Sequence, residues 1–309
     1  MRRILVLRGG ALGDFIVTLP ALALLRERWP AARIELAGNP TAAQLALARG
    51  VLDAVHSQHE ARWSALFTAA PLEAGFAGWL GQFDLVINYW PDPEETLRRH
   101  FPVRSGQQFI SAPALPTRAP AAAHYSAALA ELGLECHTHL FRLAPLPGRR
   151  GADSDRAAST HPHVQYIAAH PGSGSPRKNW PWDDWRRLLP RLPGPVSLIL
   201  GEAELERLPP RPAFEGPGEC RIRELRHRSL EELIDHFARC RLFLGHDSGI
   251  SHLAAACGVR CVLLFGPTDP VVWAPPSPHV QVLRCVPDLA SLPVDSVLRA
   301  AEAALADRT

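Results

Sequence analysis

Lys178, in the segment HPGSGSPRKNWP, is the only lysine of the chain, and the other 32 of the 33 basic residues are arginines. A lysine carries a compact ammonium on a thin stem, whereas an arginine presents a wide planar fork. A tight phosphate site is suited to such a point charge. Ala, Pro, Gly and Arg are abundant, as in a GC-rich genome, so the alternative is a lysine that survived by chance on a solvated loop. The neighbouring residues must decide.

The segment around Lys178 has the composition of a phosphate-binding loop. PGSGS, at 171–175, supplies flexible backbone amides and two hydroxyls, and Arg177 adds charge. The GxxxxGK[ST] spacing of a P-loop is absent. Backbone N–H groups, hydroxyls and a point charge within one turn can still cradle a phosphate. We expect three tryptophans to pack the helix that follows, with stacking on a base or sugar as the weaker alternative: Trp180, Trp182 and Trp185.

A second loop, RGGALGD at 8–14, joins an apolar run to a helical pattern. Three glycines in it permit tight turning and close backbone approach: Gly9, Gly10 and Gly13. Asp14 falls at the start of the helix, where capping alone would explain a carboxylate. The loop reads GGxxG and not the GxGxxG of a dinucleotide site. Glu35 also lies inside the next strand instead of at its end, so the sequence argues against nicotinamide binding.

A third loop, GHDSGISH at 245–252, also stands between an apolar run and a helical pattern. Asp247 or Ser248 is suited to cap the helix, and Gly249 lets an anion approach its free amides. Ser248 and His252 are four residues apart, but a nucleophile elbow reads GxSxG and this loop reads GxxSG. We therefore discount a hydrolase. FGPTDP, at 265–270, ends the next strand and should open onto the same crevice.

These loops depend on elements that bring them together. Apolar runs, which indicate buried strands, alternate with helical patterns along the chain. Strands are predicted at 3–7, 33–38, 54–57, 83–89, 164–169, 195–200, 220–225, 241–245, 259–266 and 280–285. Helices are predicted at 15–28, 42–50, 122–134, 182–192, 229–240, 248–258 and 293–307. Ser229 and Glu232 form a capping box. This βαβ progression predicts parallel sheets covered by helices.

The alternation breaks at 145–162, where PLPGRRGADSDRAASTHP is polar and rich in Gly, Pro and charge, as in an interdomain linker. We therefore predict two Rossmann-like, doubly wound α/β domains, 1–150 and 151–309, with ligands between them at the carboxyl ends of the strands. The last helix, 293–307, is placed to pack back on the N-terminal domain.

Composition excludes several classes of protein. A net charge of +2, from 33 basic and 31 acidic residues, does not argue for nucleic-acid binding. No apolar run approaches the ~20 residues of a membrane span. MRRILVLRGG begins like a signal peptide, but Arg8 interrupts its apolar stretch, so we interpret it as a strand.

The sequence predicts no metal site. The six cysteines form no CxxC pair and no disulfide framework, which indicates reduced core thiols in a cytoplasmic protein. CHTH, at 136–139, has no second ligand cluster. DSD, at 153–155, matches a metal-binding DxD but falls in the linker, where a solvated run of charge is expected.

Three stretches carry a resemblance to a known family: LGDFIVTLPAL from Leu12, HPGSGSPRKNWPWDDWRRL from His170, and GHDSGISHLAAACGVRCVLLFGPTDP from Gly245. In this order they resemble the glycosyltransferase family of ADP-heptose:lipopolysaccharide heptosyltransferases. The resemblance covers both domains. It implies a GT-B fold, with two Rossmann-like domains facing across a cleft. It also implies metal-free, cofactor-free, inverting transfer of a sugar from a nucleotide diphosphate to a lipopolysaccharide-core acceptor.

The resemblance also implies roles for single residues. Asp14 matches the family's general base, and Lys178 matches a lysine that neutralises the donor phosphate. The glycines of the first loop lie on the acceptor side. An acidic residue that grips the ribose should follow LILG, and Glu202 and Glu204 both fit. The other donor-binding positions are Ser173, Gly174, Asp247, Ser248, Gly249 and His252.

Two departures from the family concern the acceptor contacts more than the donor contacts. The family often has a hydroxyl residue where Gly9 or Gly10 stands, and His246 replaces a commoner small or amide residue. The partners implied are ADP-heptose and a glycolipid or glycan acceptor, in the cytoplasm, with peripheral contact at the inner face of the inner membrane. A non-catalytic sugar-nucleotide-binding protein and, less favoured, an NAD-dependent oxidoreductase remain the alternatives.

Overall fold

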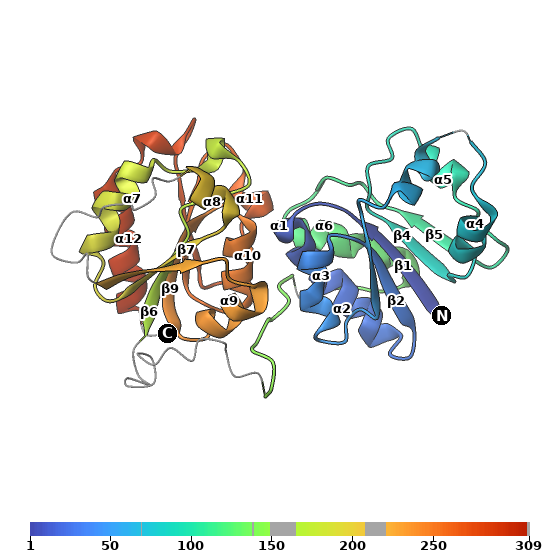
Figure 1. Cartoon of the computed structure of the whole chain (residues 1–309), viewed down its shortest axis with the longest axis horizontal. Helices are drawn as coiled ribbons and strands as arrows, with labels where there is room; N and C mark the ends of the chain where they lie inside the picture. Colours follow the sequence, from blue (N-terminus) through green and yellow to red (C-terminus); the bar gives the residue numbers. More distant parts are fainter. Residues whose placement is uncertain (69, 138, 149–164, 208–220, 308–309) are drawn as a thin grey trace. The chain divides into compact units, whose positions relative to one another are not determined.

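The computed structural model describes residues 1–307 with the exception of 69, 138, 149–164 and 208–220. The chain divides into two compact units, Met1–Phe141 and Arg142–Thr309 (Figure 1). Leu143 is buried, and its N–H donates to the Ala256 carbonyl at 2.9 Å, so the chain joins the second unit before the polar segment begins. The predicted boundary at 150/151 and the DSD sequence lie outside the described residues.

The N-terminal unit holds one parallel sheet in the order β3-β2-β1-β4-β5. The strand order reverses between β1 and β4, so the loops that follow these two strands meet at the switch point where α/β sheets bind ligands. The loop of Gly9 and Gly10 follows β1. The strands are β1 (Arg3–Arg8), β2 (Arg33–Gly38), β3 (Ala54–Ser57), β4 (Leu85–Asn88) and β5 (Gln108–Ser111).

The helices of this unit are shorter than the sequence predicts. The expected helix 15–28 is two helices, because Pro20, at the start of the second, has no N–H to continue the ladder of the first. The expected helix 122–134 changes to a 3₁₀ turn and ends at Gly133, where φ is +69°. The helices are α1 (Leu12–Ile16), α2 (Leu19–Arg28), α3 (Pro40–Leu47), α4 (Ala74–Leu80), α5 (Thr96–His100) and α6 (Ala121–Ala127), with 3₁₀ segments η1 (Ala61–Phe67) and η2 (Ala128–Leu132).

The C-terminal unit holds a second parallel sheet in the order β11-β10-β9-β6-β7-β8. β6 pairs with both β7 and β9, so the loops after β6 and β9 leave neighbouring strands at the same edge. Lys178 lies in the first of these loops and Asp247 in the second. The strands are β6 (Tyr166–Ala169), β7 (Val196–Leu200), β8 (Ile222–Arg226), β9 (Cys240–His246), β10 (Cys261–Phe265) and β11 (Val280–Arg284).

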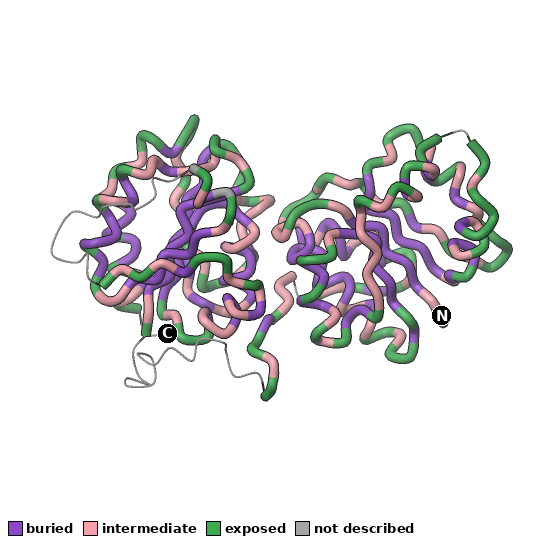
Figure 2. Tube along the Cα trace, viewed as in Figure 1, coloured by how far each residue is buried: buried purple, intermediate pink, exposed green. Residues whose placement is uncertain are grey.

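The helices of the C-terminal unit cover this sheet, whose inner strands β6, β7, β9 and β10 are largely buried (Figure 2), whereas the edge strands β8 and β11 are partly exposed. Ser229 and Glu232 form the predicted capping box at α9. The helices are α7 (Trp182–Leu188), α8 (Glu202–Arg207), α9 (Leu230–Phe237), α10 (Gly249–Ala256), α11 (Pro270–Trp273) and α12 (Val294–Ala306). The predicted class, two parallel α/β domains, is confirmed.

Two tryptophans and the terminal helix close the core of this unit. Trp180 and Trp185 are buried, in T-shaped contact at 5.4 Å, so they pack α7 as expected, whereas Trp182 is half-buried. Val297 and Ala301 of α12 belong to the same core, and α12 contacts α7, β9 and β10. The apolar face of α12 therefore packs within the C-terminal unit, and its predicted contact with the N-terminal domain stays a prediction.

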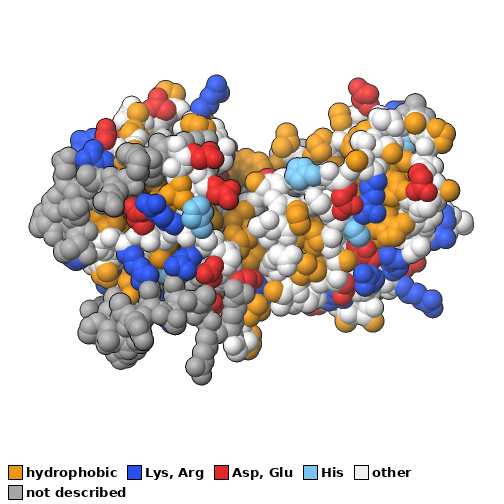
Figure 3. All heavy atoms as spheres, in the orientation of Figure 1, with side chains coloured by type: hydrophobic (Ala, Val, Ile, Leu, Met, Phe, Trp, Pro, Cys, Tyr) orange, Lys and Arg blue, Asp and Glu red, His pale blue; other side chains and the backbone are white. Residues whose placement is uncertain are grey.

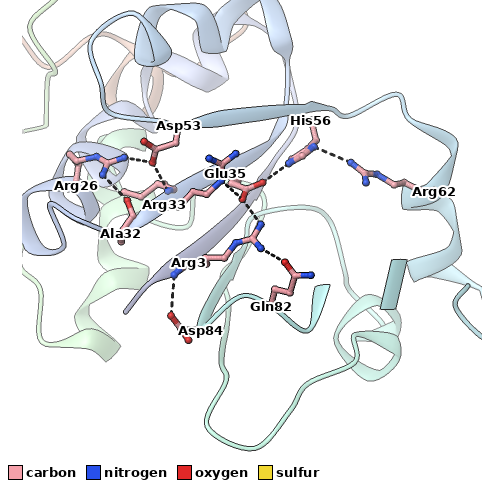
Figure 4. A network of polar contacts seen from close by, with 11 residues as sticks. Arg3, Arg26, Ala32, Arg33, Glu35, Asp53, His56, Arg62, Gln82 and Asp84 are labelled. Carbon is pink, nitrogen blue, oxygen red and sulfur yellow. Dashed lines mark hydrogen bonds and ion pairs between the residues drawn. The ribbon is translucent and has the colours of Figure 1, made fainter. Parts of the chain in front are cut away.

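Glu35 on β2 is the centre of a buried ionic network in the N-terminal unit (Figure 4). Its carboxylate receives Arg3 at 2.6 Å, Arg33 at 2.9 Å and His56 at 2.8 Å. Burial alone would raise the pKa of Glu35, but the hydrogen bonds from His56, Arg3 and Arg33 lower it to about 2. Both oxygens of this carboxylate already bind side chains of the same unit, so it is not placed to hold the ribose of a dinucleotide.

On the face drawn in Figure 3, acidic and basic side chains are interspersed, in keeping with the small net charge. Within the described part of the chain, no helix has the length and apolar character needed to cross a membrane. Cys240, Cys261 and Cys285 are free thiols.

Candidate active site

Asp14 lies in the first turn of α1, at the switch point of the N-terminal sheet. Helix α1 begins at Leu12, earlier than the sequence predicted, and Asp14 Oδ2 accepts the N–H of Ala11 at 3.0 Å. Asp14 Oδ1 accepts from the Arg8 guanidinium at 3.1 Å. The side chain remains 35% exposed, so a carboxylate oriented from two sides still reaches solvent.

Arg8 is the residue that fixes Asp14, and the sequence did not indicate it. Its side chain is only 7% exposed. The guanidinium donates to Thr18 Oγ1 at 3.1 Å and lies 4.3 Å from the centre of the Tyr125 ring. An arginine held by a hydroxyl and an aromatic face has little freedom. Asp14 is therefore an oriented partner of a buried cation as well as a helix cap.

The glycine loop packs directly against Asp14. Gly10 has a φ of +110°, and a Cβ there would lie 2.6 Å from Asp14 Oδ2, too close for any larger residue. Its N–H donates to Gln58 Oε1 at 3.0 Å, and its carbonyl accepts from Asn39 Nδ2 at 3.3 Å. This geometry explains why no hydroxyl residue stands at Gly10.

Lys178 and Asp247 meet at the edge of the C-terminal sheet. Lys178 Nζ donates to Asp247 Oδ2 at 2.6 Å, and the two side chains are 29% and 9% exposed. Ser248 caps α10 by accepting the N–H of Ser251 at 3.3 Å, and Gly249 is the first residue of that helix. The ammonium is thus tied to the residue before a helix cap, where free amides and the helix dipole favour an anion.

The loop that carries Lys178 is organised by its own hydroxyls. Ser173 is buried, and its Oγ lies 2.7 Å from the Ser175 carbonyl and 2.6 Å from Asn179 Oδ1. Ser173 was predicted to bind phosphate, but its hydroxyl is used within the loop. Gly174 is exposed, so its backbone is accessible to a ligand. His252 is buried within α10.

His246, at the end of β9, holds the loop that carries Lys178 in place. It is fully buried at the end of β9, accepts the Trp180 N–H at 2.8 Å through Nε2, and places Nδ1 3.4 Å from the Gly172 carbonyl. Burial lowers the pKa of His246 to about 3, so the ring is neutral at physiological pH. The departure from the family pattern at His246 therefore lies in the C-terminal unit, where the ring contacts the loop that carries Lys178, and its effect on acceptor contacts stays a prediction.

The structure separates the two candidate ribose ligands. Glu204 is buried and accepts the Gly201 N–H at 2.9 Å, with His170 Nε2 at 3.5 Å. A Cβ on Gly172 would overlap its carboxylate, so Glu204 ties the loop after β7 to the loop after β6. Burial alone would raise the pKa of Glu204, but hydrogen bonding to His170 lowers it. Glu202, by contrast, is exposed at the start of α8.

These residues form two groups, one in each unit. The loops after β6 and β9 bring together Lys178, Asp247 and Ser248, and Glu204 contacts Gly172 in the same loop after β6. An ammonium beside the start of a helix is suited to an anionic ligand. Asp14 and its glycines form the second group at the edge of the N-terminal sheet. Among the described residues, no three His, Cys, Asp or Glu side chains gather in the manner of a metal site.

The family comparison covers the first of these groups. Residues 143–292 match the model for glycosyltransferase family 9 (heptosyltransferase). This match covers just under half of the chain, and the chain also resembles the family in the three stretches described above. It is therefore a glycosyltransferase, as the three sequence stretches predicted.

Curated relatives and solved structures extend the likeness to both units. The chain is 25% identical over 295 residues to lipopolysaccharide heptosyltransferase 1 of Salmonella typhimurium, covering 87% of this chain and 89% of that protein. It is 28% identical over 294 residues to lipopolysaccharide heptosyltransferase 1 of Pseudomonas aeruginosa, covering 87% and 79%.

The family 9 glycosyltransferase structure from Veillonella parvula matches this fold with a TM-score of 0.79, at 22% identity, over 98% and 97% of the two chains. The structure of E. coli ADP-heptose lps heptosyltransferase II matches with a TM-score of 0.68, at 19% identity, over 99% and 98%. The predicted GT-B type of fold is confirmed.

Proposed function

We propose that this enzyme transfers a heptose from ADP-heptose to a hydroxyl of a lipopolysaccharide-core or related glycan acceptor, with inversion and without a metal ion. The observation that carries the proposal is the Lys178–Asp247 ion pair beside the start of α10. It is a single fixed cation at a helix N-terminus, in a chain of a glycosyltransferase family.

The donor diphosphate would bind in the C-terminal unit. The exposed backbone of Gly174 and the free amides at the start of α10 would bind its oxygens, and Lys178 would approach the leaving phosphate. When the bond to the anomeric carbon breaks, its electron pair passes to the leaving diphosphate. A preorganised cation at that oxygen lowers the barrier, commonly by ~3 kcal/mol for one well-placed donor. Asp247 supplies the preorganisation by holding the ammonium in place.

The acceptor would be activated in the N-terminal unit. Its hydroxyl oxygen forms the new bond to the anomeric carbon on the face opposite the leaving diphosphate, and its proton passes to the Asp14 carboxylate. Arg8 and the Ala11 N–H hold that carboxylate in one orientation, as a general base requires. Attack opposite the leaving group inverts the anomeric centre. A glycolipid acceptor would bring the enzyme to the inner face of the inner membrane.

A donor screen tests the proposal. ADP-heptose is compared with ADP-glucose, GDP-mannose and UDP-glucose, with a heptose-deficient lipopolysaccharide as acceptor, and released nucleotide diphosphate is measured with and without EDTA. We expect turnover with ADP-heptose that EDTA does not reduce. Turnover with only another donor, or activity lost to EDTA and restored by Mn²⁺ or Mg²⁺, would contradict the proposal.

A further inference from the structure

A pocket of about 430 Å³ opens beside helix α6 of the N-terminal unit. Its volume lies within the range of small-molecule sites. The chain turns at Gly133, where η2 ends with a φ of +69°, and the residues that follow line one wall. One face of α6 and η2 forms the floor, with residues that recur at intervals of three and four: Ala123, Ser126, Ala127 and Ala130.

This pocket is distinct from the group around Asp14. The Tyr125 ring lies 4.3 Å from the Arg8 guanidinium, which holds Asp14. Tyr125 is two positions away from Ala123 and from Ala127, so the helix turns it about 160° away from both. The pocket therefore opens on the opposite side of α6 from the Arg8–Asp14 pair.

Ser126 supplies the observation that points to a ligand. The residue is only 3% exposed, and its Oγ is buried without a hydrogen bond to any described group. A helical serine can donate to the carbonyl four residues earlier, but this one does not. At the same pocket, His139 Nδ1 is also buried and has no described partner. Because buried polar groups are nearly always paired, two unpaired groups at one pocket indicate a ligand that pairs with them.

Two exposed side chains of opposite charge line the same pocket, Arg118 and Glu135. Neither forms an ion pair with another described residue. The segment that carries the arginine is fixed by His124, whose Nδ1 accepts the Thr117 N–H at 3.2 Å and whose Nε2–H donates to the Pro113 carbonyl at 2.8 Å. A guanidinium and a carboxylate that are both unpaired suit a ligand that carries both charges.

We propose that this pocket binds an α-amino acid with an apolar side chain. The carboxylate of the ligand meets Arg118, its ammonium meets Glu135, and its side chain covers the alanines of the floor. Ser126 Oγ gains a hydrogen-bond partner in the ligand. A ligand with only a negative charge would be repelled by Glu135, and one with only a positive charge by Arg118. The inference goes beyond the proposed function and does not depend on it.

Saturation-transfer NMR titrations on the full chain test the ligand class with four probes. L-Phenylalanine is compared with its methyl ester, which lacks the carboxylate, with N-acetyl-L-phenylalanine, which lacks the ammonium, and with glycine, which lacks the apolar side chain. We expect L-phenylalanine to bind at least about tenfold more tightly than each of the others, the scale of one hydrogen bond to a charged group.

Variants assign the binding to this pocket. Arg118→Gln should remove the preference over the methyl ester, and Glu135→Gln should remove the preference over the N-acetyl compound. Ser126→Ala should weaken L-phenylalanine several-fold and leave the melting temperature unchanged, because its hydroxyl has no partner in the fold. Arg99→Gln and Glu94→Gln, at exposed residues of the same unit outside the pocket lining, are the matched controls and should bind as the wild type does.

Four results would overturn the inference. Two concern the probes: equal binding of all four, or no binding of L-phenylalanine at millimolar concentration. Tighter binding in Glu135→Gln would show that the pocket takes an anion instead of a zwitterion. Unchanged binding in both Arg118→Gln and Ser126→Ala would place the amino acid elsewhere on the chain.

Discussion

The Arg8 guanidinium lies 3.1 Å from Asp14 Oδ1, with the arginine only 7% exposed and the aspartate 35% exposed. This ion pair changes how Asp14 must be tested. Asp14 is the third residue of α1 and accepts the N–H of the N-cap residue Ala11, a hydrogen bond that an asparagine oxygen can also accept. Asp14→Asn, however, also leaves a buried arginine without its carboxylate. A loss of stability is therefore expected in that variant whether or not Asp14 is a base.

Lys178→Ala should lower kcat by about a hundredfold or more, because it removes the fixed cation at the leaving group. Lys178→Arg should recover little, since a planar fork does not replace a point charge held 2.6 Å from Asp247. Steady-state kinetics measures both. Arg299→Ala, at an exposed arginine on α12 of the same unit, is the control and should stay within a few-fold of the wild type. Full activity in Lys178→Arg would show that the site does not require a lysine, as expected if Lys178 was retained by chance.

Substitutions of Glu202 and Glu204, the two glutamates after β7, should affect different properties of the enzyme. Glu202 is exposed, so Glu202→Gln should raise the KM for the donor several-fold with little change in the melting temperature. Glu204 is buried against Gly172 and His170. Glu204→Gln should therefore lower the free energy of unfolding by about 1–3 kcal/mol, and the melting temperature with it. Differential scanning fluorimetry and donor titration separate the two effects. A stable Glu204→Gln variant with a raised KM would assign the ribose contact to Glu204 instead.

His246 should make the chain sensitive to mild acid. The folded protein keeps its ring neutral down to pH about 3, whereas the unfolded chain takes up a proton below the ordinary value of 6.5. Its stabilisation is therefore complete above pH 6.5 and is lost as the pH falls from 6.5 toward 3. One pH unit below 6.5, the loss is about 1.4 kcal/mol. Urea unfolding at pH 7.5 and 5.5 should show this loss in the wild type and not in His246→Gln. The same change in the free energy of unfolding between the two pH values in both proteins would contradict the prediction.

Glu35 should act in a more acidic window. Its pKa falls from 4.5 to about 2 on folding, so its contribution is complete above pH 4.5 and is lost as the pH falls toward 2. At neutral pH this amounts to about 3 kcal/mol. Glu35→Gln should lose about that much stability at pH 7 and approach the wild type near pH 2.5, as measured by urea unfolding. A difference that does not change with pH would place the effect in packing instead of charge.

The sequence predicted the parts of the fold that depend on local pattern. The buried strands, the capping box at Ser229 and the Ser248 cap follow from short-range spacing, and they lie where predicted. The edge strand β5 was missed because only Ile110 of its four residues is buried, so it leaves little apolar signal.

The features of the site that the sequence did not indicate depend on contacts between residues far apart in the chain. Arg8 acquires its function from Tyr125, which no spacing rule connects with it. The contact of His246 with the loop that carries Lys178 could not be predicted, because Trp180 and Gly172 are far from it in the sequence. Glu202 and Glu204 were equivalent in the sequence, and only burial distinguishes them.

A matched pair of variants separates the base from the ion pair. Asp14→Asn removes both the carboxylate and its pairing with Arg8, whereas Arg8→Gln breaks the same pair and keeps the carboxylate. Both should lower the melting temperature. Neither should change the affinity for ADP, because the proposed donor residues lie in the C-terminal unit.

The rate of sugar transfer by these two variants, measured at saturating ADP-heptose, tests the central claim most directly. A general base commonly contributes ~10²–10⁴ in rate, so Asp14→Asn should fall at least about a hundredfold. Arg8→Gln, which retains the base, should fall by no more than about tenfold, the scale of one misplaced contact. Equal losses in the two variants, or transfer within a few-fold of the wild type in Asp14→Asn, would show that Asp14 serves the fold and not the proton transfer.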